Sequence, residues 1–268
     1  MSIIGDILER RELLYNLVAR NLKSRYKDSI LGFLWSIITP LFMALIYLVF
    51  LRILNRGTPM EEILIGVFAW QFTAQCVGNG LTAITDNSNL VKKVYFPRII
   101  LPLSTTLSNL VTFLLSLIVQ FALVAIMLAV RGQYMSPAVL AVPLLIVYHA
   151  LFCLALTLFL SCLNVYFRDI QHLVNVLTTA WFFLSPAMYS MALVHNLAAS
   201  HARPALITAL YMLNPMAIII TGYRALILPG TAFPWSPFVL ASATLPLLFL
   251  LLAYVLFQKL QRKFSDFF

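Results

Sequence analysis

The chain alternates between long uncharged apolar runs and short charged segments. The first run extends from Ser29 to Leu51 and contains no Asp, Glu, Lys or Arg over 23 residues. About 20 predominantly apolar residues are enough for a helix to cross the hydrocarbon core of a bilayer. The recurring pattern predicts an all-α polytopic membrane protein. Six transmembrane helices are expected, at residues 30–54, 63–84, 99–130, 137–163, 173–194 and 237–257.

Prolines interrupt several of these apolar runs. Pro40 predicts a kink in the first span and Pro186 a break in the fifth, because Pro removes a backbone donor. Residues 205–228 are also apolar, but Asn214 and Pro215 divide them into pieces too short to cross. If this stretch did cross, the basic residues after the last span would lie outside, against the positive-inside tendency. We therefore expect two short re-entrant or periplasmic helices here, between helices five and six.

Basic residues gather on one side of the resulting topology. Of the 18 Lys and Arg residues, 13 fall on segments assigned to the cytoplasm. Residues 1–29 mix apolar positions at mostly helical spacing with charged ones, which predicts an amphipathic helix on the inner membrane surface. This segment has no continuous apolar core, so it does not predict a cleavable signal peptide. Residues 30–268 form one membrane domain with a cytoplasmic loop at 85–98, and both termini are expected in the cytoplasm.

The composition argues against several classes of protein. The chain is 62% hydrophobic and 10% charged, whereas soluble domains are about 25% charged. Its net charge of +9 does not predict nucleic-acid binding, because the basic residues stand at the flanks of membrane helices. The glycine-rich loop that cradles nucleotide phosphates is missing from the sequence, so the energy for active transport would come from another polypeptide. We expect no catalytic residues, metal or cofactor on this chain.

Ionisable groups are absent from the middle of the predicted spans, with one exception. No Asp or Glu falls there, which argues against a proton- or sodium-coupled transporter. His149 is the one histidine at mid-membrane, and we expect it to serve packing. Cys76, Cys153 and Cys162 lie within apolar runs without metal-ligand spacing, so we expect small buried hydrophobic side chains there. The second span has a polar middle, which should face protein or water.

Several short motifs occur in a fixed order between residues 25 and 224. They are RYKDSILGFLWSIITPL (25–41), VYFPRIILPLS (94–104), NVYFRDI (164–170), FFLSPAMY (182–189), NPM (214–216) and GYR (222–224). Each is weak evidence alone. Together they resemble the membrane-spanning subunits of type-2 ABC exporters that carry lipid-linked O-antigen polysaccharide or teichoic acid.

The resemblance implies partners for this chain. It implies a homodimer in the bilayer bound to two copies of a separate ABC ATPase subunit, which would hold ATP and Mg. It also implies that the amino-terminal helix and the 85–98 loop contact that ATPase, where apolar side chains of the loop fit a groove on the partner. The expected docking residues are Arg20, Arg25, Tyr26, Lys27, Asn87, Leu90, Val91, Lys92, Lys93, Val94 and Tyr95.

The resemblance further implies a path for an undecaprenyl-linked polysaccharide at the dimer interface, lined by the first and fifth spans. Sugar rings stack on aromatic faces, although Trp and Tyr also form interfacial belts in any membrane protein. The aromatic candidates are Trp35, Tyr47, Phe72, Trp181, Phe182, Phe183 and Tyr189. The candidates for a periplasmic gate are Tyr211, Pro215, Tyr223 and Arg224. Arg224 would contact either the emerging glycan or a lipid phosphate.

Two alternatives stay open at this point. One is a type-2 exporter for a drug, a small lipid or teichoic acid, which would share the same motifs. The other is a polytopic lipid-linked glycosyltransferase. Such an enzyme needs acidic or metal-binding residues grouped at one membrane face, and only Asp86 and Asp169 lie on the predicted inner loops.

Overall fold

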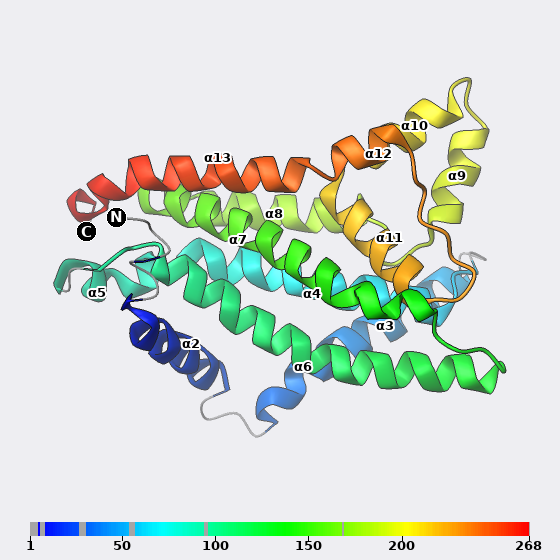
Figure 1. Cartoon of the computed structure of the whole chain (residues 1–268), viewed down its shortest axis with the longest axis horizontal. Helices are drawn as coiled ribbons and strands as arrows, with labels where there is room; N and C mark the ends of the chain where they lie inside the picture. The colour runs from blue at the N-terminus through cyan, green and yellow to red at the C-terminus, as the bar shows by residue number, and fades with distance from the viewer. Residues whose placement is uncertain are drawn as a thin grey trace.

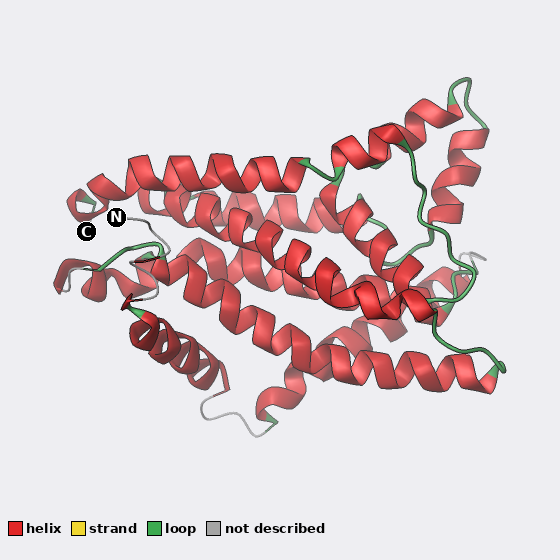
Figure 2. Ribbon diagram, in the orientation of Figure 1, coloured by secondary structure: helices red, strands yellow, loops and turns green. Residues whose placement is uncertain are grey.

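The protein is an elongated helical bundle. The computed structural model describes residues 5, 9–26, 31–53, 57–93, 96–167 and 169–267. Within these residues the regular structure is helical, and no strand is drawn (Figure 2). Helices α2 (Arg11–Tyr26) and α5 (Ser88–Lys93) lie at the same end of the bundle as the C-terminus (Figure 1). Helices α9 (Met191–Ala199) and α10 (Pro204–Tyr211) lie at the opposite end.

The other helices lie between these two ends (Figure 1). They are α3 (Trp35–Ile53), α4 (Met60–Thr82), α6 (Ile100–Val130), α7 (Val142–Tyr166), α8 (Ile170–Phe183), α11 (Pro215–Ile227), α12 (Pro237–Ser242) and α13 (Leu245–Leu260). In the described part of the chain, 3₁₀ turns accompany them at Gly32–Leu34, Thr85–Asn87, Pro137–Ala141 and Gln261–Asp266.

Within the described residues, four helical stretches are long and apolar enough to cross a membrane. They are Trp35–Ile53, Ile100–Val130, Pro137–Tyr166 and Pro237–Phe264. These stretches confirm the first, third, fourth and sixth predicted spans as apolar helices. The first continues through Pro40 as one helix. The count of six spans stays a prediction.

The other two predicted spans differ in form. Helix α4 is a single helix of 23 residues, which is long enough to cross a membrane. The polar residues in its middle make it less apolar than the four stretches above, so it is not counted among them. The prediction of a fifth span over 173–194 was wrong in its extent, because α8 ends at Phe183 and turns follow to Tyr189. A helix of 14 residues is about 21 Å long, which is shorter than the hydrocarbon core. The break predicted from Pro186 lies in these turns.

The apolar stretch predicted to form two short helices does so. Helices α10 and α11 are separated by a break at residues 212–214 and bend by 95°. Pro215 is the first residue of α11, a position that lacks an intrahelical hydrogen bond in any case. Whether the pair is a broken span or a re-entrant element stays a prediction.

A separate core cluster of buried side chains lies at the end of the bundle that carries α2. Leu17 of α2, Val91 of α5 and Phe264 after α13 are all buried in it together with residues of α6 and α7. The hydroxyl of Tyr166 donates to the carbonyl of Leu260, at 3.0 Å. The cluster therefore ties α2, the 85–98 loop and the C-terminal segment to the bundle.

Candidate functional site

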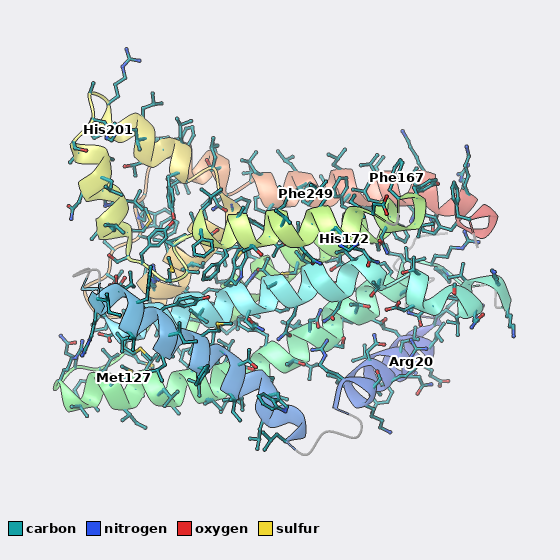
Figure 3. All side chains as sticks on the ribbon, turned by 180° about the vertical axis from the view of Figure 1, so that it is seen from behind. Arg20, Met127, Phe167, His172, His201 and Phe249 are labelled. Carbon is teal, nitrogen blue, oxygen red and sulfur yellow. The ribbon has the colours of Figure 1, made fainter. Side chains whose placement is uncertain are left out.

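The two segments predicted to contact an ATPase lie side by side. The guanidinium of Arg20, on α2, donates to the side-chain oxygen of Asn87, in the 85–98 loop. Asn87 in turn donates to the carbonyl of Ala83 at 2.8 Å. Lys92 and Lys93, at the end of α5, are exposed. The hydrogen bond thus joins Arg20 to the loop that carries Lys92 and Lys93, and Figure 3 shows Arg20 at this end of the bundle.

Some of the other predicted docking residues differ from these three. Val91 is 6% exposed and packs in the core cluster beneath α5, so it cannot fill a groove on a partner in this conformation. Leu90 is half-buried against the same cluster. Lys27, Val94, Tyr95 and the side chain of Tyr26 lie outside the described part of the chain.

Arg25 also turns inward, because polar groups of two membrane helices surround its guanidinium. It donates to the side-chain oxygen of Asn109 and lies 3.3 Å from Thr112 Oγ1, both on α6. It also donates to Gln75 Oε1 on α4, at 3.4 Å. Asn79 donates to the same Asn109 oxygen at 2.9 Å. This polar network explains the polar middle of α4 and fixes the C-terminal turn of α2 to the bundle.

At the other end of the bundle, Asn214 joins the FFLSPAMY (182–189) and NPM (214–216) motifs. Its side-chain oxygen caps α11 by accepting from the backbone N–H of Met216, at 3.0 Å, and also accepts from Trp181 Nε1, at 2.9 Å. Its amide donates to the carbonyl of Leu184 and to Ser185 Oγ, at 3.1 and 2.9 Å. All donors and acceptors of one side chain thus link the end of α8 to the start of α11.

Arg224, a predicted gate residue, is only 2% exposed. Its Nε and Nη2 donate to the backbone carbonyl of Glu62 at 3.1 and 2.8 Å, and its Nη1 donates to the carbonyl of Tyr189 at 2.9 Å. The Glu62 carboxylate lies 4.0 Å from Nε. In this conformation Arg224 therefore holds α11 against α4 and the turn after α8, and it offers no exposed group to a glycan or a lipid phosphate.

Gly66 makes this arrangement possible. A Cβ atom at this position of α4 would lie 2.2 Å from the carbonyl oxygen of Ala187 and 2.9 Å from Arg224 Nη2. Real Cβ atoms do not approach a carbonyl so closely, since hard-sphere contact forbids it. The turn after α8 can rest on α4 only because residue 66 has no side chain.

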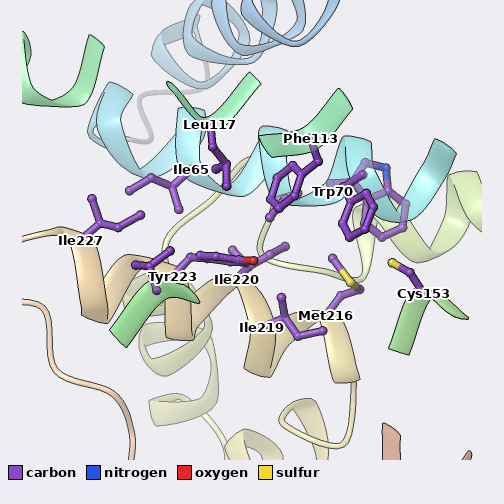
Figure 4. Packing of buried hydrophobic residues seen from close by; sticks show 14 of the residues in the cluster. Ile65, Trp70, Phe113, Leu117, Cys153, Met216, Ile219, Ile220, Tyr223 and Ile227 are labelled. Carbon is purple, nitrogen blue, oxygen red and sulfur yellow. The ribbon is translucent and has the colours of Figure 1, made fainter. Parts of the chain in front are cut away.

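The predicted gate tyrosines occupy different environments. The hydroxyls of Tyr189 and Tyr211 are 2.9 Å apart, and Tyr189 also donates to the carbonyl of Phe183 at 3.1 Å. This pair joins the turn after α8 to α10. Tyr223 lies instead in the main core, beside Phe113, Ile220 and Met216 (Figure 4). Its role in this conformation is packing.

The seven aromatic candidates fall into four groups. Trp35 and Phe183 are exposed. Tyr47, Trp181 and Phe182 belong to an aromatic cluster built around Trp70, whose ring centroid lies 5.4 Å from those of Trp181 and Phe182. Tyr189 belongs to the tyrosine pair, while Phe72 is 1% exposed and stacks on Phe113 at 4.6 Å. Phe72 therefore cannot line a path in this conformation.

One polar feature of α8 was missed by the sequence analysis. His172, Asn175 and Thr179 are exposed and spaced by three and four residues, so they share one face of the helix. Only Val174 and Phe182 of α8 are buried within the chain. Polar residues at this spacing inside an apolar helix were the available signal. Such a face does not suit contact with lipid tails.

His149 has the packing environment expected of it. Its Nε2 lies 2.7 Å from Thr73 Oγ1, and its ring contacts the rings of Phe72, Phe113 and Tyr223 edge-on or tilted. The described residues contain no group of three or more His, Cys, Asp or Glu side chains that could hold a metal ion.

Comparison with known proteins defines the class. Residues 12–228 match the family described as ABC-2 type transporter, and the chain belongs to this membrane permease family. It is similar to proteins named O-antigen export system permease protein RfbA. The protein from Myxococcus xanthus is 32% identical over 269 residues, covering 99% of each chain. Two from Klebsiella pneumoniae are 30% identical, over 224 and 223 residues, covering 82% of this chain and 82% and 81% of theirs.

Proposed function

We propose that the chain is the membrane permease subunit of an ATP-driven exporter that moves lipid-linked O-antigen polysaccharide from the cytoplasmic to the periplasmic side of a bacterial inner membrane. The observation that carries this proposal is the match over 99% of the chain to an O-antigen export permease. The substrate is an undecaprenyl-linked polysaccharide, and both termini of the chain lie in the cytoplasm. ATP and Mg bind to a separate ATPase subunit.

The permease works as a homodimer with the path between the two copies. This arrangement is supported by two helix faces that other described parts of the chain leave exposed. Helix α3 buries only Pro40, Ala44 and Leu51, although it is 19 residues long. The polar face of α8 needs water or protein rather than lipid around it. A second copy placed against α3 and α8 supplies protein on both sides of a hydrated path, where Trp35 and Phe183 are free to stack on sugar rings.

Two copies of an ABC ATPase dock on the surface made by Arg20, Lys92 and Lys93. The hydrogen bond between Arg20 and Asn87 supports this assignment, because it makes one surface from the two predicted docking segments. Closure of the ATPase pair would move α2 and the 85–98 loop as one body. The Arg25 network then carries that movement to α4 and α6.

Replacing Lys92 and Lys93 together with Glu tests the docking surface. We expect the ATPase to stop co-purifying with the permease and O-antigen to disappear from the cell surface, because charge complementarity is reversed. Arg203→Glu is the control, since Arg203 is exposed at the α9–α10 end. If the Lys92→Glu, Lys93→Glu protein assembles and exports as well as the control, the docking assignment is wrong.

The same contacts serve a type-2 exporter of teichoic acid, a small lipid or a drug. Export assays with each lipid-linked substrate separate these candidates. A lipid-linked glycosyltransferase is the weaker alternative, because the described inner loops place no group of acidic residues together. Incorporation of labelled sugar by the purified chain would favour that enzyme.

A further inference from the structure

An apolar cavity lies behind α11, on the side away from Arg224. It has a volume of about 270 Å³ and lies between α7, α11, α12 and the connection at residues 228–236. An engineered apolar cavity of about 150 Å³ stays dry and binds a small hydrophobic molecule, so this one is large enough for a ligand. Its walls include Leu145, Ile218, Leu226, Phe233, Trp235 and Leu240.

The lining offers little to a polar ligand. Its residues carry two polar side-chain groups: the hydroxyl of Tyr148, which already donates to the carbonyl of Ala243 at 2.8 Å, and the indole N–H of Trp235, a residue that is 73% exposed. A water molecule needs two to four polar partners to be stable in such a place. The ligand that fits is therefore a hydrocarbon.

The cavity reaches the outer surface of the bundle. Trp235 and Leu240 both line it and are exposed, Trp235 to 73%. Around them α7 exposes Leu144 and Val147, and α13 exposes further leucines, which makes an apolar outer face. Trp side chains concentrate where lipid headgroups meet the hydrocarbon. The position of Trp235 therefore places the mouth of the cavity at the depth where acyl chains begin.

We propose that this cavity binds one acyl chain of a bilayer phospholipid. The occupant follows from the location, because α12 and α13 belong to a stretch that is apolar and long enough to cross the membrane. Bilayer acyl chains are the apolar molecules present at that depth. This inference rests on the membrane setting of the chain and not on the exported substrate.

The bound chain would support α11 from behind. Ile218, Gly222 and Leu226 face the cavity, whereas Tyr223 and Arg224 face the core. A Cβ atom at residue 222 would lie 3.1 Å from Leu145 Cδ2, so a glycine here keeps the cavity wide. Occupancy of the cavity thus acts on the same helix that Arg224 holds against α4.

Photolabelling tests the proposal. The full chain is reconstituted in phosphatidylethanolamine and phosphatidylglycerol vesicles that contain phosphatidylcholine with a diazirine on one acyl chain, and labelled residues are mapped by mass spectrometry. We expect strong labelling of Leu226, Phe233 and Leu240. The exposed residues Ile118 and Ile126 of α6 report ordinary lipid contact in the same sample.

A variant that fills the cavity separates binding from surface contact. Ala225→Phe should lower labelling of the cavity residues about tenfold relative to labelling of α6. An acyl chain that loses room for two methylene groups binds about tenfold more weakly. Ala122→Phe, on the exposed face of α6, is the matched control and should leave the ratio unchanged. Ala243→Phe, at the residue after α12, fills the cavity from another side if Ala225→Phe fails to fold.

Two results would overturn the proposal. The first is cavity labelling that equals α6 labelling and stays unchanged in both filling variants, which would mean ordinary surface contact. The second is a crosslink from Trp235 or Leu240 to another copy of the chain in place of lipid, which would mean that protein occupies the cavity.

Discussion

Arg224 donates two hydrogen bonds to the backbone carbonyl of Glu62, so a residue of the GYR motif anchors the first turn of α4. Arg224 also donates to the turn after α8, which joins three segments from distant parts of the sequence. A buried guanidinium stabilises only when its donors are paired, and here they are paired mostly with main-chain oxygens. The end of the bundle that carries α9 and α10 thus depends on main-chain positions as much as on side chains.

Gly66→Ala should disrupt this junction. The added methyl would meet the carbonyl of Ala187 at 2.2 Å, so the turn after α8 must move away from α4. Overpacking of this kind costs about 1–3 kcal/mol. Thermal unfolding in detergent measures the loss. The matched control is Gly78→Ala on the same helix, where an added Cβ meets nothing within 4 Å. The control should keep or slightly raise the stability, because Ala favours helix.

Asn214→Ala should loosen the connection between α8 and α11. It removes the cap of α11 and leaves the indole N–H of Trp181 without its acceptor. A buried donor left unpaired costs about 1–3 kcal/mol. We expect lower thermal stability and a red shift of tryptophan emission as water reaches Trp181. Asn196→Ala, at an exposed position of α9, should change neither. Equal behaviour of the two variants would contradict the assigned role of Asn214.

Arg25→Lys should release α2 while keeping its charge. A lysine ammonium cannot reach Gln75, Asn109 and Thr112 in the geometry of a planar guanidinium. Hydrogen exchange of α2 should therefore accelerate, with little change in the centre of α7. Lys23→Arg, on the exposed side of α2, is the control. Unchanged exchange in Arg25→Lys would show that the network does not hold α2.

Phe72→Ala should lower stability, whereas Phe183→Ala should lower export and leave stability almost unchanged. Phe72 is stacked in the core, so its loss should cost about 3–5 kcal/mol of stability. Phe183 is 54% exposed, and its loss should change stability by no more than about 0.5 kcal/mol. If Phe183 lines the path, its replacement should lower export at normal protein levels. If the Phe183→Ala protein exports as well as the wild type, Phe183 does not line the path.

The pattern of apolar runs predicted the helices that are marked by a long uncharged stretch of the local sequence. Helices α3, α6, α7 and α13 each follow a long uncharged run, and the break between α10 and α11 follows from Asn214 and Pro215. Pro186 predicted a break after α8, but the end of the helix at Phe183 and the turns that follow were not predictable in the same way. Residues 184–194 are as apolar as the helix before them, and the turn is stabilised by contacts with Asn214 and Gly66.

The candidate site was predicted only in part, because it too depends on contacts between distant segments. The motifs identified which segments matter, but burial of individual side chains depends on packing between distant segments. The resemblance assigned Arg25 to contact with a partner, whereas its acceptors lie 50 and 84 residues away on α4 and α6. Val91 and Phe72 were likewise selected by residue type and lie within the core. The polar face of α8 was present in the sequence spacing and was overlooked.

The central claim is that two copies enclose a hydrated path along the polar face of α8. In a chain whose cysteines are replaced, Asn175→Cys in the assembled exporter should react with a water-soluble maleimide, because water reaches that face. Ile118→Cys, on the exposed apolar face of α6, should react far more slowly, since lipid covers it. Equal, slow reaction at both positions would contradict the account, because α8 would then face lipid and not a path.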